Sequence, residues 1–198
     1  KTVYYRLRDL AGNIRTVSDT ITLDKTKPAT LSVTSPVAGT TYRGSITLTI
    51  TAQDNYSIAG IECLVDGVTV ATTTGASMNA TWATTAVNDG AHQVYYQVTD
   101  AAGNIAETSI ISITVDNTIP ETVMIVSPAA GEHVSGILSI EAVAADAINV
   151  AQVEFYVDGT STLMGSRTTA PWTMAASSTT LSEGSHTLYA RCIDGAAN

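Results

Sequence analysis

The chain has 198 residues, of which 44 % are hydrophobic, so it is long enough for one large or two small domains and apolar enough to fold. Its formal net charge is −9, and an acidic surface repels phosphate backbones and anionic membranes, so the charge argues against nucleic acid as a partner. The sequence has no apolar run near the ~20 residues that cross a bilayer as a helix, so we expect no membrane insertion in this segment.

The first predicted element is a pair of strands within residues 1–27, joined by a turn of sequence DLAGN. The segment VYYRLRDLAGN at residues 3–13 is repeated as VYYQVTDAAGN at residues 94–104. A less similar copy, LYARCIDGAAN, lies at residues 188–198. An isolated hairpin is marginal in water. We therefore expect residues 1–27 to be the C-terminal two strands of a preceding repeat, with further chain beyond the given sequence.

Residues 28–117 are predicted to form a complete unit. In the stretch 45–52, Ile46, Leu48 and Ile50 alternate with threonines, and this period of two indicates a strand with one buried face. Turn sequences such as VDGV, NDGA and DAAGN separate further strands. These strands place the following residues on the inner face: Ile61, Cys63, Val65, Val94, Tyr96, Val98, Ile111, Ile113 and Val115, the last three in a strand predicted at 108–115. About seven short strands in two packed antiparallel sheets follow from this pattern.

Residues 118–198 repeat the middle unit. TSPVAGTTYRGSITLTITAQD at 34–54 matches VSPAAGEHVSGILSIEAVAAD at 126–146, and IECLVDG at 61–67 matches VEFYVDG at 153–159. Phrases that keep their order and spacing indicate internal duplication, and a step of about 90 residues suits one small β-sandwich. We expect this third repeat to lack its last strand, so that the ends of the given chain do not coincide with the repeat boundaries. The junctions LDKTKP and VDNTIP end in proline, which suits a short, stiff linker.

Four motifs carry a resemblance: V-x-F-Y-V-D-G, D/E-G-x-H-x-[VL]-Y, D-x-A-G-N and a D-N-T-x-P linker. In this order and spacing they resemble the bacterial Ig-like tandem repeats of secreted and surface proteins, and the resemblance covers essentially the whole chain. The final repeat departs from it by reading DGAAN. The resemblance implies an all-β fold of tandem Ig-like antiparallel β-sandwiches and an extracellular or cell-surface location in bacteria. It also implies work as a spacer, stalk or adhesion module, or as an accessory domain of a polysaccharide-degrading enzyme.

Oxygen ligands gather at the predicted turns and junctions. Carboxylate and carbonyl oxygens suit Ca²⁺, and some surface Ig-like tandems that this arrangement resembles use calcium to stiffen their junctions. The candidate ligands, expected to converge near one end of a domain, are Asp54, Asn55, Asp100, Asp116 and Asn117, with Asp24 and Asp146 at the related positions. The alternative for Asp100 is local turn chemistry, in which its carboxylate accepts from the backbone of Ala102 or Gly103. Structural calcium is the one cofactor that the sequence suggests.

Other reactive side chains have structural explanations. Cys63 and Cys192 occupy inner positions of different units, so we expect two unpaired, buried thiols. His92 and His186, each alone in its repeat, are predicted strand-edge residues. Trp82 and Trp172 are predicted to lie in the core or at its edge, with stacking on sugar rings as the alternative. Two acids alternate outward on their strands and are predicted to be solvated: Glu62 and Glu154.

The sequence holds no nucleophile elbow, Gly-rich phosphate loop or Cys/His metal spacing, so we expect no enzyme. Our hypothesis is a non-enzymatic structural module, an extracellular spacer, stalk or fibre segment built of tandem Ig-like domains, with an adhesin as one possible parent protein. The alternative is a carbohydrate- or surface-binding accessory module of a larger secreted protein or enzyme. The expected partners are flanking Ig-like domains of the same chain. A second type of partner is a neighbouring copy whose Ile14–Leu23 segment fills the open edge of the third unit by strand exchange.

Overall fold

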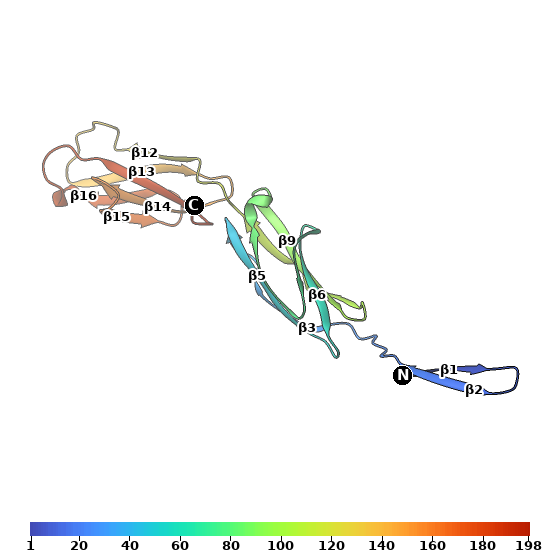
Figure 1. Cartoon of the computed structure of the whole chain (residues 1–198). Helices are drawn as coiled ribbons and strands as arrows, with labels where there is room; N and C mark the ends of the chain where they lie inside the picture. The colour runs from blue at the N-terminus through green and yellow to red at the C-terminus, as the bar shows by residue number, and fades with distance from the viewer. The chain divides into compact units, whose positions relative to one another are not determined.

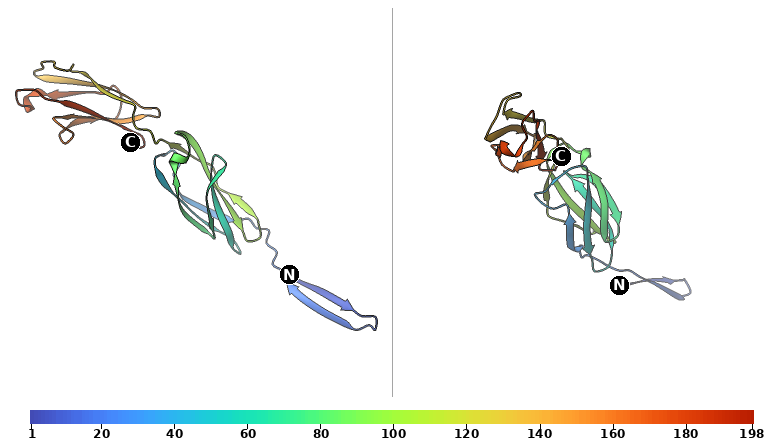
Figure 2. Two further views of the ribbon diagram at one scale, coloured as in Figure 1. Left: turned by 45° about the horizontal axis from the view of Figure 1, so that its top comes forward. Right: turned by 90° about the vertical axis from the view of Figure 1, so that its left-hand side faces the viewer.

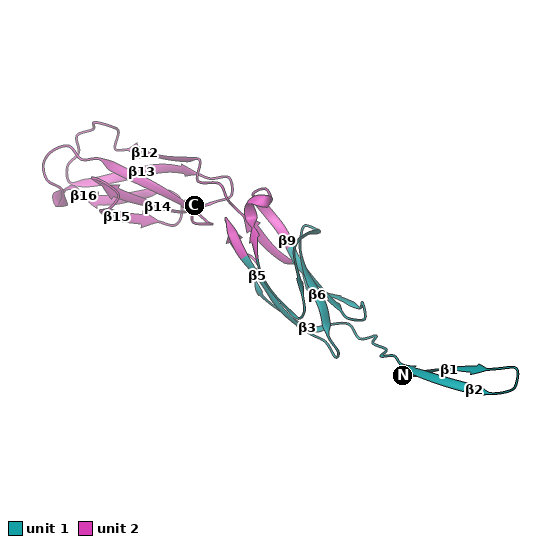
Figure 3. Cartoon of the chain, in the orientation of Figure 1, with its two compact units in different colours: residues 1–36, 47–80, 94–110 teal, residues 37–46, 81–93, 111–198 magenta.

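The computed structural model describes all 198 residues, and almost all of its regular structure is β-strand (Figure 1). Two short 3₁₀ turns, η1 (Thr84–Ala86) and η2 (Ser178–Thr180), are the exceptions. The prediction of an all-β chain is therefore confirmed. The chain divides into two compact units (Figure 3): unit 1 is residues 1–36, 47–80 and 94–110, and unit 2 is residues 37–46, 81–93 and 111–198.

The unit boundary does not follow the predicted repeat boundaries. It passes through three strands of residues 28–117, namely β5 (Ser45–Gln53), β8 (Ser77–Ala83) and β9 (Gly90–Asp100). The repeat limits 1–27, 28–117 and 118–198 stay a prediction.

Unit 1 begins with a hairpin of β1 (Thr2–Arg8) and β2 (Ile14–Thr20), seen as a two-stranded ribbon in both views of Figure 2. The strands pair from Thr2↔Thr20 to Arg8↔Ile14, and every residue of both is exposed. The DLAGN turn explains the tight connection. The Asp9 carboxylate accepts from the backbone N–H of Asn13 at 2.8 Å, and Gly12 has a φ of +88°, which glycine adopts without steric cost.

Two sheets follow in unit 1. In one, β3 (Ala29–Ser35) pairs with β5, which is followed in strand order by β8. In the other, β6 (Ile58–Val65) lies between β7 (Val68–Thr74) and β9, and the short β10 (Ile105–Glu107) also pairs with β9. The predicted alternation is confirmed, because Leu48, Ile50, Cys63 and Val94 have no exposed surface.

The first strands of unit 2 are β4 (Thr41–Tyr42) and β11 (Ile111–Val115), which pair in parallel. The strand predicted at 108–115 is therefore three residues shorter at its start. Thr108 instead contacts Tyr96, whose backbone N–H donates to the Thr108 hydroxyl at 3.0 Å and whose carbonyl accepts from the Thr108 N–H at 3.0 Å. These two hydrogen bonds lie between the end of β10 at Glu107 and the start of β11 at Ile111.

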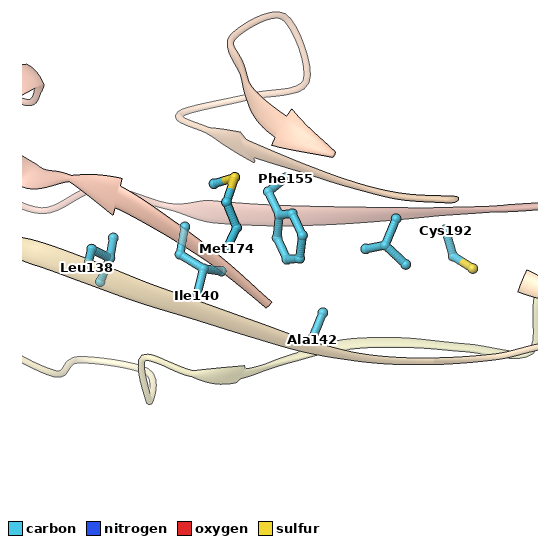
Figure 4. Packing of buried hydrophobic residues seen from close by; sticks show 7 residues of the cluster. Leu138, Ile140, Ala142, Phe155, Met174 and Cys192 are labelled. Atoms are coloured by element: carbon cyan, nitrogen blue, oxygen red, sulfur yellow. The ribbon is translucent and has the colours of Figure 1, made fainter. Parts of the chain in front are cut away.

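The rest of unit 2 is a β-sandwich. One sheet has the order β12 (Thr122–Ser127), β13 (Ile137–Ala145), β16 (Thr173–Ser177), and the other has the order β15 (Leu163–Arg167), β14 (Val150–Val157), β17 (Leu188–Asp194). Their inner faces meet in one core (Figure 4), which consists of Leu138, Ile140, Ala142, Val153, Phe155, Met174 and Cys192. Side chains that alternate along β13 point toward those of β14 and β17, as expected for aligned sheets.

Both cysteines are buried free thiols, as predicted. Burial raises the pKa of the Cys63 thiol to about 11 and also raises the pKa of Cys192. Each therefore packs as a small hydrophobic side chain.

Candidate functional site

The structure divides the candidate calcium ligands into two aspartate clusters instead of the single convergent set that we expected. The unit 1 triad consists of Asp24, Asp54 and Asp100, and the unit 2 triad consists of Asp116, Asp146 and Asp194. In each triad, one carboxylate oxygen per residue lies within 4.8 Å of the other two. Corresponding members are 92 to 94 residues apart, so the second triad repeats the first. Asn55 lies beside the unit 1 triad, where its side chain donates to Asp24 Oδ1 at 3.3 Å.

In the unit 1 triad, the buried Asp100 has hydrogen-bond donors on both oxygens. Its Oδ1 accepts from the backbone N–H groups of Ala102 and Asn104, both at 2.8 Å, and its Oδ2 accepts from the Asn104 side chain at 2.7 Å. Burial alone would raise the pKa of Asp100, but these donors outweigh it and hold the pKa below the ordinary value. The turn chemistry predicted with Ala102 is present, while Gly103 donates to the Asp100 backbone carbonyl instead.

The other two members of the unit 1 triad are only partly buried. Asp24 Oδ1 accepts from the Thr26 N–H at 3.0 Å and from the Asn55 side chain at 3.3 Å. Asp54 Oδ2 accepts from the Tyr56 N–H at 2.8 Å, which leaves only Asp54 Oδ1 buried without a donor. Donors from the chain therefore satisfy most of this cluster.

The unit 2 triad is much less satisfied. Asp116 is 1 % exposed, and both of its carboxylate oxygens are buried with no more than a weak contact to the backbone N–H of Thr118. Asp194 is 2 % exposed; its Oδ1 accepts from the N–H groups of Ala196 and Asn198, but its Oδ2 has no partner. Asp146 Oδ1 accepts from the Ile148 N–H at 2.8 Å, and its Oδ2 is again without a partner. Four of the six carboxylate oxygens of this triad are therefore buried without a well-formed hydrogen bond.

The burial and close spacing of the unit 2 triad affect the pKa of Asp116. Burial is the main factor that raises the pKa of Asp116, and the nearby charges of Asp194 and Asp146 raise it further. A buried carboxylate is costly unless it is paired, hydrogen-bonded or bound to a metal. The unit 2 triad therefore has the chemistry of a hard-cation site, with oxygen ligands only.

Asn117, predicted as a ligand, holds the neighbouring loops together. Its Oδ1 accepts from the Gly44 N–H at 2.8 Å and from the Thr84 hydroxyl at 2.9 Å. Its own N–H donates to Asp89 Oδ1 at 2.8 Å. The Thr118 hydroxyl and the Asn117 N–H hold the pKa of Asp89 below its usual range. Sequence reasoning missed Asp89, whose only signal was its place in the NDG turn.

The prediction of a solvated Glu154 is wrong. Its side chain is 13 % exposed, and its Oε2 accepts from Arg191 Nε at 2.8 Å and from the Tyr156 hydroxyl at 2.6 Å. The Tyr156 hydroxyl, followed by Arg191, lowers the pKa of Glu154. Glu154 faces outward on β14, but long side chains from the same sheet cover it. Glu62 is exposed, as predicted.

His186 lies two residues before the start of β17, not on a strand edge as predicted, and has a carboxylate partner that the sequence did not reveal. Its Nδ1 lies 2.7 Å from Asp158 Oδ2, and its Nε2 lies 2.9 Å from the Ser182 carbonyl oxygen. Asp158 raises the pKa of His186, and His186 lowers the pKa of Asp158. The raised histidine pKa adds stability below about pH 6.5 that is lost as pH rises, while the lowered aspartate pKa adds stability above about pH 4 that is lost in acid. The pair therefore contributes most between these two values.

The tryptophans do not form an exposed aromatic surface. Trp82 is 4 % exposed, and Trp172 is partly buried against the core of the sandwich of β12 to β17. This placement agrees with the core prediction and counts against stacking on sugar rings.

No helix of the chain has the length and apolar character of a membrane span.

Comparison with known proteins identifies two stretches of similarity. A family model described as a bacterial Ig domain matches residues 30–95 and 122–190. Among solved structures, the fibronectin(III)-like modules of Clostridium thermocellum CbhA share 21 % identity over 85 % of this chain and 87 % of that chain, with a TM-score of 0.51. That likeness shows the fold.

Two further structures are more distant. Dimeric latent PorU from Porphyromonas gingivalis shares 14 % identity over 96 % of this chain and 20 % of that chain, with a TM-score of 0.39. The FN1–FN3 domains of chicken CNTN1 share 10 % identity over 98 % of this chain and 70 % of that chain, with a TM-score of 0.35. No curated protein sequence matches the chain.

Proposed function

Because the chain belongs to the family of bacterial Ig domains, we propose that it is a non-enzymatic spacer segment of a larger extracellular protein. In this role each folded Ig-like sandwich adds a fixed length to the protein, and the short junctions between sandwiches resist bending. The segment serves as part of a stalk or fibre body.

One repeated hydrogen bond carries this proposal. The side chain of Asn104, which ends the DAAGN turn, donates to the Thr26 carbonyl oxygen in the first junction at 3.2 Å. The side chain of Asn198 donates to the Thr118 carbonyl oxygen in the second junction at 3.3 Å and to the Asp116 carbonyl oxygen at 2.9 Å. Thr26 and Thr118 are 92 residues apart and occupy the same place in the two junctions.

The repetition has a mechanical consequence. Each junction backbone is fastened to the last turn of the sandwich that follows it in sequence, by a donor that the repeat supplies every time. Proline at the end of each junction restricts φ further. Together these features favour a stiff spacer over a flexible linker.

We expect the junction backbone to be as ordered as the strands. For residues 24–27 and 116–119, ¹⁵N relaxation should give order parameters near ~0.85, the value of rigid backbone. Asn104→Ala should lower the order parameters at residues 24–27, because it removes the hydrogen bond to the Thr26 carbonyl oxygen. The order parameters at residues 116–119 should stay unchanged, because the bond from Asn198 to Thr118 remains. Asn13→Ala, which changes the corresponding turn residue of the exposed hairpin, is the matched control. Wild-type order parameters below ~0.6 at both junctions would contradict a stiff spacer.

A further inference from the structure

Strand β17 has a partner on only one of its two edges. It pairs with β14, and no strand of the chain pairs with its other side, which we call the open edge of β17. The corresponding strand of residues 28–117, β9, pairs with β6 on one side and with β10 on the other. An unpaired edge presents a row of backbone N–H and C=O groups that can pair with another chain.

The inner face of β17 is also less covered than the inner face of β9. On β9, three alternate side chains have no exposed surface, namely Val94, Tyr96 and Val98. The corresponding β17 residues lie 94 positions later. Of these, Leu188 and Ala190 are only partly buried, and Cys192 is 9 % exposed. A strand added at the open edge would therefore bury apolar surface as well as pair backbone groups.

A second part of the same sandwich lacks a partner strand. In residues 28–117, Thr41 and Tyr42 form β4 by pairing with β11. The corresponding residues, 92 positions later, are His133 and Val134, which belong to no strand. The Val134 side chain is exposed. The sandwich of β12 to β17 is thus open at both places where residues 28–117 hold β10 and β11.

Residues 14–23 carry side chains that fit these two places. Ile21 and Leu23 lie 92 positions before two residues of β11. Those two residues, Ile113 and Val115, are buried in the core. Ile21 and Leu23 are instead 53 % and 54 % exposed. The segment therefore presents to solvent the same kind of side chains that β11 buries.

We propose that residues 14–23 of one copy of this chain pair with the open edge of β17 in a second copy. The pairing of β10 with β9 supplies the register, because Ala106 lies opposite Val98. Arg15 is the residue 91 positions before Ala106. Cys192 is the residue 94 positions after Val98. Arg15 of one copy therefore lies opposite Cys192 of the other.

The far end of the segment reaches the second open place. In the pairing of β11 with β4, Val115 lies opposite Tyr42. The corresponding pair is Leu23 of one copy and Val134 of the other. Both side chains are exposed in the single chain, so the contact removes two apolar side chains from water.

This contact joins two different surfaces of the chain. Each copy offers one donor segment, residues 14–23, and one acceptor, the open edge of β17. Head-to-tail contacts of this kind extend into an open filament unless a rotation closes them into a ring. The association between copies goes beyond the proposed spacer role and does not rest on it, because one chain can be stiff without associating.

Light scattering coupled to size-exclusion chromatography tests the association across a dilution series of the whole chain. Wild type should show an average mass at least about twofold above that of one chain, and this mass should fall toward 20.5 kDa on dilution. Ile21→Ser combined with Leu23→Ser should stay at 20.5 kDa at every concentration. Both residues are exposed in the single chain, so the double variant should fold normally.

A matched control separates strand pairing from general stickiness of the exposed hairpin. Tyr4 and Leu10 are also exposed, and both lie outside residues 14–23. Tyr4→Ser combined with Leu10→Ser removes a similar amount of apolar surface. This variant should associate like wild type.

Arg15→Cys tests the register covalently. Opposite residues of antiparallel strands have Cα atoms about 4.5–5.5 Å apart, within the range for a disulfide. Oxidation should link the introduced thiol of one copy to Cys192 of the next and give a ladder on a non-reducing gel. Two introduced thiols can pair only with each other, which gives dimers and no ladder. Adding Cys192→Ser should therefore remove every band beyond the dimer.

Three results would each overturn the proposal. One is a wild-type mass of 20.5 kDa at every concentration. Another is association of the variant with Ile21→Ser and Leu23→Ser that equals wild type. The third is a ladder from Arg15→Cys that is missing or that persists after Cys192→Ser.

Discussion

Replacing Phe155 with alanine is expected to destabilise the sandwich of β12 to β17 by about 3–5 kcal/mol. Phe155 is 1 % exposed and lies in the centre of the core, where Leu138, Ile140 and Met174 surround it (Figure 4). It is the only phenylalanine in the chain. The substitution removes the buried ring and leaves a cavity that neighbouring β-strands fill only partly.

Urea unfolding followed by tryptophan fluorescence in a Trp82→Phe background measures this effect, because Trp172 packs against the same core. The matched control is Ile137→Ala. Ile137 is 81 % exposed on β13, one residue before Leu138, so its loss should change the free energy of unfolding by less than about 0.5 kcal/mol. A Phe155→Ala effect below about 1 kcal/mol would show that this core does not hold the sandwich together.

Gly60→Ala is the second substitution with a large expected effect, about 1–3 kcal/mol of destabilisation. A Cβ at Gly60 would lie 2.8 Å from the backbone carbonyl oxygen of Thr73. The contact is with backbone, so no side-chain rotation relieves it. Strand β7 must move away from β6, which weakens the ladder that pairs Gly60 with Thr74.

The repeat provides the control for this prediction. The position that corresponds to Gly60 is Gln152, which lies outside the pairing of β14 with β15, since that ladder begins at Val153↔Arg167. Gln152→Ala should therefore cost little. Equal effects of the two substitutions on the urea midpoint would disprove the close-approach explanation for Gly60.

Much of the fold could be predicted from sequence because strand burial has a period of two. Leu48, Cys63 and Val94 lie inside as predicted, and the family resemblance is confirmed by the two matched stretches. The start of β11 could not be predicted. It depends on the hydroxyl of Thr108, which takes the place of a backbone partner for Tyr96. Threonine is also a good strand former, so residue type alone does not distinguish the two outcomes.

The residue type of the triads could be predicted from the sequence, but which aspartates lie together could not. Turn and junction positions drew attention to Asp54, Asp100 and Asp116, which lie in two different triads. Which of them meet depends on where strands end in three dimensions, and the clusters separate because each requires one junction aspartate and two strand-end aspartates. Whether an oxygen lacks a donor depends on single turns: DAAGN satisfies Asp100 fully, whereas DGAAN leaves one oxygen of Asp194 unpaired.

Single-molecule stretching tests the central claim, that the chain is a tandem of separately folded sandwiches with a mechanical role. Held by its ends, the chain should unfold in discrete steps. Each step should release roughly 25–30 nm, the extended length of about 80–90 residues at ~3.3–3.6 Å per residue, less the size of the folded domain. Steps of that length would support the account. One step that releases the whole chain, or gradual extension without steps, would contradict it.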